Sequence, residues 1–324
     1  MRIKLYESNS FDPYENLAVE QYLLENVEED VCILYLWQNQ NTVVIGKNQN
    51  PWKECRTTLL EQEGCSLARR LSGGGAVFHD LGNLNFTFLV SQHRYDLQRQ
   101  LSVICQGVNK LGIRAELSGR NDILAEGRKF SGNAFYKNGK QAYHHGTLLV
   151  DVDMQKLGRY LNPSKAKLQA KGVDSVRSRV VNLKELNPEI TIEDLKKALA
   201  EAFSQVYESE AQWIDSKSLD WEQIWQLRSR NESWQWNYGQ KVPFSFECED
   251  RFSWGGIQIT LQVENAVVTT AKVYSDSMDW ELPGQVENAL LGARFTREDL
   301  IARISSMPVL VNEDLIQLLS NQDI

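Results

Sequence analysis

Two arginines precede three successive glycines in the stretch ARRLSGGGAVFHDLGN (68–83). A run of glycine costs backbone entropy, so it usually marks a required turn or a close approach of the backbone to a ligand. Bare backbone N–H groups beside Arg69 and Arg70 would suit an anion such as phosphate. Because the patterns G-x-x-x-x-G-K-[ST] and G-x-G-x-x-G are both absent, a nucleotide would be bound here by another kind of loop. A mobile surface loop is the alternative interpretation.

A second polar stretch, SGRNDILAEGRKFSGNA (118–134), contains two residues suited to phosphate chemistry. Lys129 lies on a predicted strand beside small residues, from which its ammonium group could enter a cavity and bind a phosphate as a point charge. Asp122 could hold a metal-bound phosphate or cap a turn. A solvated surface side chain is the alternative for a lone lysine.

Two adjacent histidines, His144 and His145, occur in AYHHGTLLVDVD (142–153). Neighbouring residues of a strand face opposite sides of the sheet, so these two cannot both bind one metal ion without distortion. With only His79 and His93 elsewhere, the sequence disfavours a histidine-based metal site. We expect one of the pair near a pocket and the other on the opposite face.

A locally basic segment covers residues 164–184, where six Lys or Arg side chains accompany one Asp. The whole chain of 324 residues, in contrast, has a formal net charge of −8. The segment is either a solvated loop or a flap that closes over a polyanion.

The composition is typical of a soluble globular protein, with 42% hydrophobic and 24% charged residues. The length predicts two domains, and the acidic balance argues against a general nucleic-acid binder. The first residues lack the apolar core of a signal peptide, and no run approaches the ~18 apolar residues of a membrane span, so we expect a cytoplasmic protein. Five cysteines form no C-x-x-C pair, which indicates free thiols in a reducing compartment.

Periodicity and capping signals predict the elements that must position these residues. Asp12, Pro13 and Glu15 mark the start of one helix, and Thr191 with Asp194 marks another. Helices are predicted over 12–27, 96–111, 191–207, 219–229, 284–291, 297–305 and 313–320. Strands are predicted over 31–38, 41–47, 75–80 and 83–90, the last two as a pair.

Two further strand groups are predicted from turn signals. Residues 129–153 form a hairpin in which Asn138-Gly139 supplies a type I′ turn, which needs positive φ at both positions. Residues 251–277 form two or three strands with a turn at Glu264-Asn265.

Together these stretches resemble the lipoate–protein ligase A family. The matching segments, in the family's order, are TVVIGKNQNPWKEC (42–55), LARRLSGGGAVFHDLGNLNFTF (67–88), SGRNDI (118–123), GRKFSGNA (127–134), HHGTLLVDVD (144–153) and LNPSKAKLQAKGVDSVRSRVVNL (161–183). The stretch WGGIQITLQVENAVVTTAKVYSDS (254–277) resembles the family's small accessory domain. The resemblance implies a mixed-sheet α/β (α+β) biotin/lipoate ligase-like catalytic domain over 1–246 and a C-terminal α+β accessory domain over 247–324.

The resemblance also implies a two-step reaction. Free lipoate, or octanoate, would react with ATP to give lipoyl-AMP and pyrophosphate, with Mg²⁺ as the metal ion. The lipoyl group would then pass to a lysine of an acceptor protein. The expected acceptors are lipoyl domains of 2-oxoacid dehydrogenase acyltransferase subunits and glycine cleavage H protein, and neither nucleic acid nor membrane is an expected partner.

Site residues are carried over from the family motifs. Lys129 would be the catalytic residue, in contact with the lipoyl carbonyl and the phosphate. Adenylate contacts are expected from Arg70, Gly75, Ala76, Val77, Phe78, Asn121, Asp122 and Lys129, and Asp122 would also be the Mg²⁺ ligand. Lipoate contacts are expected from Lys129, Leu71, Ser72, Gly73, Gly74, Val77, His79 and His145. The flap over the adenylate would comprise Lys165, Lys171, Gly172, Val173, Ser175, Arg177 and Arg179.

Three alternatives differ in their chemistry. Octanoyl and lipoyl transferases of the same fold use a cysteine nucleophile and no ATP, and no cysteine lies in 68–83, 127–134 or 144–147. Biotin–protein ligases also form an acyl adenylate, but with a different Arg-Gly spacing. A non-catalytic lipoate carrier would not need Arg70 and Lys129.

Overall fold

The computed structural model describes residues 1–118, 122–161, 180–238, 246–264 and 267–322. None of the helices within these ranges has both the length and the apolar character needed to cross a membrane.

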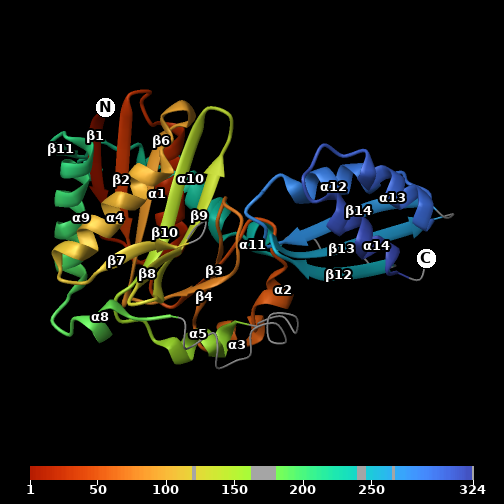
Figure 1. Ribbon diagram of the computed structural model, residues 1–324, viewed down its shortest axis with the longest axis horizontal. Coiled ribbons are helices and arrows are strands. Elements are labelled where there is room, and N and C mark those ends of the chain that lie inside the picture. The colour runs from red at the N-terminus through yellow and green to blue at the C-terminus, as the bar shows by residue number, and fades with distance from the viewer. Residues whose placement is uncertain (119–121, 162–179, 239–245, 265–266, 323–324) are drawn as a thin grey trace.

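An eight-stranded mixed sheet forms the centre of the N-terminal part (Figure 1). Its order is β11-β1-β2-β6-β10-β9-β8-β7, in which β1 is parallel to both of its neighbours and the other pairs are antiparallel. The strands are β1 (Arg2–Glu7), β2 (Val31–Trp37), β6 (Asn83–Ser91), β7 (Ala115–Ser118), β8 (Asp122–Ala125), β9 (Arg128–Lys137), β10 (Gln141–Leu149) and β11 (Ala211–Trp213).

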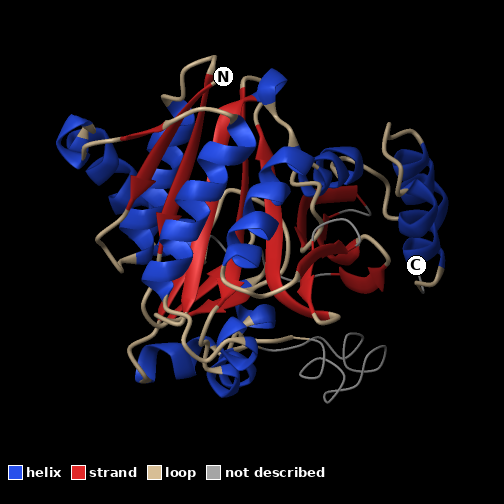
Figure 2. Cartoon of the chain, turned by 60° about the vertical axis from the view of Figure 1, so that its left-hand side comes forward, coloured by secondary structure: helices blue, strands red, loops and turns tan. Residues whose placement is uncertain are grey.

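Helices cover this sheet (Figure 2). One face, which carries Phe86 and Phe88, packs against α4 and α9. The opposite face, which carries Leu89 and Tyr143, packs against α1 and α10. These helices are α1 (Pro13–Glu25), α4 (Leu97–Lys110), α9 (Ile192–Tyr207) and α10 (Trp221–Glu232). Alternate residues of β6 therefore belong to two different cores, as the period of a strand requires.

The predicted helices are present, and the capping residues predicted for two of them, α1 and α9, are confirmed. The Asp12 carboxylate accepts a hydrogen bond from the Tyr14 N–H at 2.8 Å and caps α1, with Pro13 in the first turn. Thr191 and Asp194 form a reciprocal capping box at α9.

A three-stranded sheet, β4-β3-β5, lies beside the large one and carries the glycine stretch between β4 and β5. Its strands are β3 (Thr42–Ile45), β4 (Ser66–Arg69) and β5 (Val77–His79), and nearby short helices are α2 (Pro51–Glu54), α3 (Thr57–Gln62), α5 (Met154–Tyr160) and α8 (Leu183–Leu186). The predicted pairing of 75–80 with 83–90 is wrong, because β5 pairs with β3. Asp80 accepts a hydrogen bond from the Gly82 N–H at 2.9 Å, and this turn moves the chain from one sheet to the other.

The hairpin β9–β10 forms as predicted, but its turn is not type I′. Gly139 has a φ of +90°, whereas Asn138 is not among the residues with positive φ. The Asn138 side chain accepts from the Lys140 and Gln141 N–H groups at 3.0 and 2.7 Å. The asparagine thus closes a three-residue loop through its side chain, without adopting the left-handed conformation.

The C-terminal part contains the sheet β12-β13-β14 and three helices, as the sequence predicts. They are β12 (Phe246–Phe252), β13 (Gly255–Glu264), β14 (Val267–Ser275), α12 (Leu282–Leu290), α13 (Arg297–Ser305) and α14 (Asn312–Ser320), and α11 (Trp234–Asn237) precedes them. Residue 265 of the predicted turn lies outside the described residues. The buried cluster of this part uses only residues between Cys248 and Leu319.

Candidate active site

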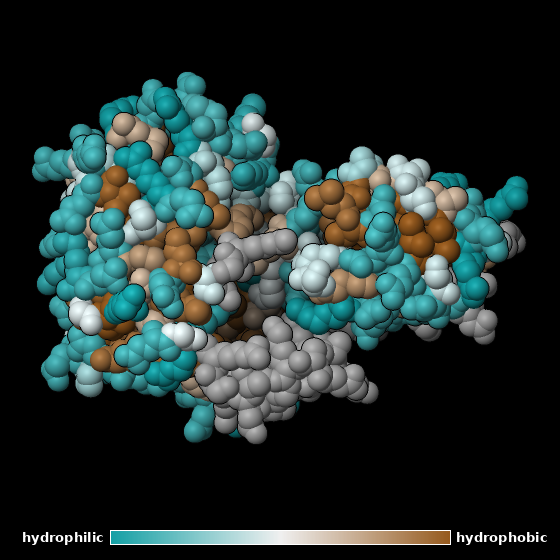
Figure 3. Space-filling model, in the orientation of Figure 1, coloured by the Kyte–Doolittle hydropathy of each residue, from teal (hydrophilic) through white to brown (hydrophobic). Residues whose placement is uncertain are grey.

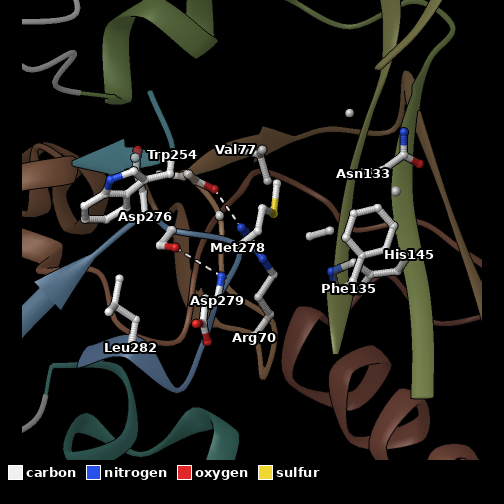
Figure 4. Close-up of a pocket in the computed structure, with 18 of the residues that line it drawn as sticks. Arg70, Val77, Asn133, Phe135, His145, Trp254, Asp276, Met278, Asp279 and Leu282 are labelled. Atoms are coloured by element: carbon white, nitrogen blue, oxygen red, sulfur yellow. Dashed lines mark hydrogen bonds between the residues drawn. The ribbon is translucent and has the colours of Figure 1, made fainter. Parts of the chain in front are cut away.

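A cavity of about 1650 Å³ lies between the large sheet, the glycine stretch and the C-terminal part. Figure 3 shows the surface hollowed between the two parts of the chain. In Figure 4, Arg70, Val77 and Met278 lie between Asn133 and His145 on one side and Trp254 and Leu282 on the other. Residues far apart in the sequence therefore line one space.

Arg70 stabilises the conformation of the glycine stretch through hydrogen bonds from its side chain. Its guanidinium donates to the carbonyls of Gly73 at 2.7 Å and Gly75 at 2.8 Å, and its Nε donates to the Ser72 hydroxyl at 3.0 Å. Burial lowers the pKa of Arg70 to about 10, so the side chain stays cationic at neutral pH. The loop therefore has a fixed positive charge in the cavity wall.

Two glycines of this region are required by close packing. A Cβ on Gly46 would lie 2.3 Å from the Gly74 carbonyl oxygen, and a Cβ on Gly73 would lie 2.3 Å from the Ser277 carbonyl oxygen. Neither backbone oxygen can move away without displacing its own strand or loop.

Hydrogen bonds at the end of β14 and in the segment after it join the C-terminal part to the glycine stretch and to Asn48. The Gly74 N–H donates to the Ser277 carbonyl at 3.1 Å, and the Ser275 N–H donates to the Asn48 carbonyl at 2.7 Å. The Lys47 ammonium lies 4.4 Å from the centre of the Trp280 ring. The C-terminal part is thus a wall of the site.

A hydrogen-bonded chain connects α1 to Arg70. The Glu20 carboxylate accepts from His145 Nδ1 at 2.8 Å, and His145 Nε2 lies 2.8 Å from the Ser72 hydroxyl. Because a carboxylate only accepts, Nδ1 carries a proton and donates to Glu20, and Nε2 is the ring atom that bonds the Ser72 hydroxyl. Ser72 in turn accepts from Arg70. A buried carboxylate therefore orients the arginine through two intermediates.

His144 faces away from the cavity, as expected from strand alternation. It packs among Phe86, Phe88 and Phe135, with Nε2 2.8 Å from Asn133 Oδ1. Burial lowers the pKa of His144 to about 3, from an ordinary value of 6.5.

This low pKa of His144 predicts a pH dependence of stability. Below about pH 6.5 the His144 imidazole binds a proton in the unfolded chain but not in the folded chain. The folded state therefore loses stability as the pH falls from 6.5 toward 3. Between pH 7 and pH 5, the free energy of unfolding should therefore fall by about 2 kcal/mol less in His144→Gln than in the wild type. Urea unfolding at both pH values measures this difference. His93→Gln, at an exposed histidine, should keep the wild-type slope. Equal slopes for His144→Gln and the wild type would contradict this explanation.

Lys129 lies in the cavity wall on β9. The Val181 N–H donates to its carbonyl at 2.9 Å, and a Cβ built on Gly132 would lie 3.3 Å from Lys129 Nζ. Asp122 begins β8, with its backbone paired to Gly132. The Asp122 side chain, Asn121 and the predicted flap residues Lys165, Lys171, Gly172, Val173, Ser175, Arg177 and Arg179 lie outside what the structure describes.

The cavity brings together most of the described residues predicted for the site. Those that line it are Arg70, Gly74, Gly75, Ala76, Val77, His79, Lys129 and His145. Ser72 is buried behind the wall, Gly73 lies against Ser277, Leu71 packs toward the α1 core, and Phe78 packs against Tyr160.

Several lining or supporting residues escaped the sequence analysis. Glu20 lies three residues after Leu17 and four before Leu24, so a carboxylate on the apolar stripe of a helix was the available signal. Asn85 is likewise a polar residue within a buried, mostly apolar strand, β6, and this was the available signal. For Asp276, which lines the cavity from the C-terminal part, no local pattern gave a signal.

No group of three His, Cys, Asp or Glu side chains that could hold a metal ion occurs within the described ranges. Mg²⁺ is commonly bound through one or two carboxylates together with substrate phosphates, so this finding concerns only an all-protein metal site.

Comparisons with known proteins agree with this architecture. The model of the lipoyl protein ligase A/B catalytic domain matches residues 12–204, and the bacterial lipoate protein ligase C-terminus matches residues 241–319. The structure of P. falciparum LipL1 in complex with lipoate is 29% identical, with a TM-score of 0.87 over 99% of this chain and 100% of that chain.

Two other solved structures are similar over about three quarters of this chain. One is a bi-partite lipoate protein ligase from Thermoplasma acidophilum, described with its E2 lipoyl domain: 25% identity, TM-score 0.66, 75% of this chain and 98% of that chain. The other is a lipoate-protein ligase A bound with ATP: 26% identity, TM-score 0.63, 74% of this chain and 98% of that chain.

Proposed function

Because the chain belongs to the lipoyl protein ligase A/B catalytic family, we propose that it activates free lipoate with ATP and transfers the lipoyl group to a lysine of an acceptor protein. The observation that carries the proposal is one cavity that is lined by Lys129, by the glycine stretch that Arg70 holds, and by residues of four neighbouring strands, β2, β6, β10 and β9. Two anionic reactants can meet only where positive charge and backbone donors offset their repulsion.

In the first step, an oxygen of the lipoate carboxylate attacks the α-phosphorus of ATP. The bond from that phosphorus to its bridging oxygen breaks, and pyrophosphate leaves. Lys129 offsets the charge that develops on the attacked phosphate. Arg70 positions the loop by donating hydrogen bonds to the Gly73 and Gly75 carbonyls. Its own positive charge adds to that of Lys129.

In the second step, the neutral ε-amine of the acceptor lysine attacks the acyl carbon of lipoyl-AMP. The bond from that carbon to the phosphate oxygen breaks, AMP leaves, and the amine loses its proton to solvent. Lys129, next to the acyl carbonyl, polarises it toward attack. The same ammonium group thus serves both steps from one position.

A magnesium ion would neutralise phosphate charge during activation. The residue proposed to hold it is Asp122, whose backbone begins β8 next to Gly132 and so lies near Lys129. A single carboxylate with phosphate oxygens is a suitable donor set for this ion.

For the acceptors, we propose lipoyl domains of 2-oxoacid dehydrogenase acyltransferase subunits and glycine cleavage H protein. The Thermoplasma neighbour, described with its E2 lipoyl domain, supports the first of these. A division of the chain at 246/247 is part of the same proposal, and the separate core from Cys248 to Leu319 supports it.

An ATP-independent transferase of the same fold would need a cysteine nucleophile at the cavity. None of the five cysteines is among the described lining residues. Burial raises the pKa of Cys32, Cys55 and Cys248 to about 12, which disfavours their thiolates. The thiol chemistry of a transferase thus has no support at this site.

Isotope exchange tests the proposal directly. Labelled pyrophosphate should enter ATP when the purified full chain is incubated with lipoate, and it should not do so without the acid. If no exchange occurs while supplied lipoyl-AMP still modifies an acceptor domain, the chain is a transferase that does not activate lipoate.

A further inference from the structure

Two polar side chains deep in the cavity wall have an atom without a hydrogen-bond partner. They are Nδ2 of Asn85 and Nε2 of His79, and their residues are only 2% and 3% exposed. Both residues line the cavity. A buried donor without an acceptor is costly, so an unpaired pair in one wall points to a ligand atom.

The hydrogen bonds around His79 identify the unpaired atom as a donor. Asn16 Nδ2 donates to the Gln38 carbonyl at 2.8 Å and to Asn39 Oδ1 at 3.0 Å. Asn39 must therefore turn its Nδ2 toward His79 Nδ1, at 3.2 Å. Nδ1 accepts this bond, so the proton of the neutral ring is on Nε2.

Asn85 has the same character. Its Oδ1 accepts from Asn83 Nδ2 at 2.9 Å, which leaves Nδ2 of Asn85 and Oδ1 of Asn83 without a partner. Nε2 of His79 and Nδ2 of Asn85, the two that belong to lining residues, are thus unpaired donors in this part of the wall.

The strand register places these donors at a defined distance from Lys129. Gly132, on which a Cβ would lie 3.3 Å from Lys129 Nζ, donates through its N–H to the Thr147 hydroxyl at 3.3 Å. Thr147 pairs with Asn85, and Asn85 pairs with Trp37. Since strands lie about 4.8 Å apart, Asn85 is roughly 10 Å across the sheet from Gly132.

The row of residues Gly132, Thr147, Asn85 and Trp37 ends at two aromatic rings, those of Trp37 and His79. The Trp37 and His79 rings meet edge to face, with centres 6.2 Å apart. An acid whose carboxylate lies at Lys129 and whose chain crosses Thr147 would reach Asn85 and His79 with its tip, because two strand spacings are close to the extended length of an eight-carbon acid.

We propose that Asn85 and His79 form a donor pair that binds the dithiolane sulfurs and selects a sulfur-tipped acyl chain over a plain aliphatic chain of the same length. The inference rests on the proposed function only in taking lipoate as the occupant. Sulfur is a weak acceptor and packs well against aromatic rings such as Trp37. An octanoyl tip has no acceptor atom and would leave both donors unpaired.

Calorimetric binding to the full chain without ATP tests the selection separately from activation. The wild type should bind lipoate at least about tenfold more tightly than octanoate. In Asn85→Leu this ratio should fall at least about fivefold, mainly through tighter octanoate binding. The matched control is Ser91→Ala, at the other end of the same face of β6, which should keep the wild-type ratio.

The outcomes are distinct. A folded Asn85→Leu with the wild-type ratio, or a wild type that binds both acids equally, overturns the donor pair. If Asn85→Leu does not fold, 6-oxooctanoate decides: its carbonyl acceptor should make it bind the wild type more tightly than octanoate, and equal or weaker binding overturns the inference. Loss of pyrophosphate exchange with the binding ratio intact would refute the ATP-dependent activity but leave the donor pair standing.

Discussion

Replacing Lys129 with alanine should lower lipoate-dependent pyrophosphate exchange by at least about a thousandfold and leave the fold intact. The side chain lies at the cavity wall over Gly132, where the proposed reaction brings the lipoate carboxylate and the α-phosphate of ATP together. Loss of one oriented donor at a developing charge typically costs a factor of about 10²–10³, and here a full positive charge is lost as well. Rates of exchange, together with urea unfolding curves, measure both parts of the prediction.

Lys137→Ala is the matched control for Lys129→Ala. Lys137 ends the same strand, and its ammonium lies 4.3 Å from the centre of the Tyr95 ring, remote from the cavity lining. Exchange by this variant should equal that of the wild type. Near-normal exchange by Lys129→Ala would remove Lys129 from the mechanism, whatever the control does.

Replacing Glu20 with alanine should cost about 3 kcal/mol of stability and about a hundredfold in exchange rate. Glu20 Oε1 accepts from His145 Nδ1 and from the Thr87 hydroxyl at 2.7 Å, so its removal leaves two buried donors unpaired. His145 would then lose the group that orients it toward Ser72, and Arg70 would lose a charge that compensates its own. The glycine stretch would lose its fixed shape as a consequence.

Glu20→Gln tests whether the effect of the alanine variant comes from the lost hydrogen bonds. The amide oxygen can still accept both bonds, so this variant should recover most of the stability and at least tenfold of the exchange rate lost in the alanine variant. Glu25→Ala, at an exposed carboxylate of the same helix, should change stability by less than about 0.5 kcal/mol. If glutamine proves as damaging as alanine, the chain from Glu20 to Arg70 does not work through hydrogen bonds.

The sequence predicted much of the fold because many of its signals are local. The capping residues Asp12 and Thr191 set the starts of α1 and α9, and the apolar stripe of 96–111 became the buried face of α4. Such signals depend on residues within one or two turns, so neighbours along the chain suffice to specify them.

The prediction was wrong where a local signal had more than one solution. Asn138 can close a turn through its backbone or through its side chain, and the structure uses the side chain. The strand 75–80 can pair with any free edge, and it pairs with β3 because the turn at Asp80 directs it away from β6.

For the site, the sequence by itself determined the chemical groups: a glycine stretch with Arg70, a lysine on a strand, and one histidine of a pair facing a pocket. These follow from residue type and strand alternation, which act over a few residues. The tertiary structure alone decided that Glu20 reaches His145, that Ser277 packs on Gly73, and that Asn85 lies in one row with Thr147 and Trp37. The partners in these contacts are between 48 and 204 positions apart, and only the register of the sheet and the packing of the two parts bring them together.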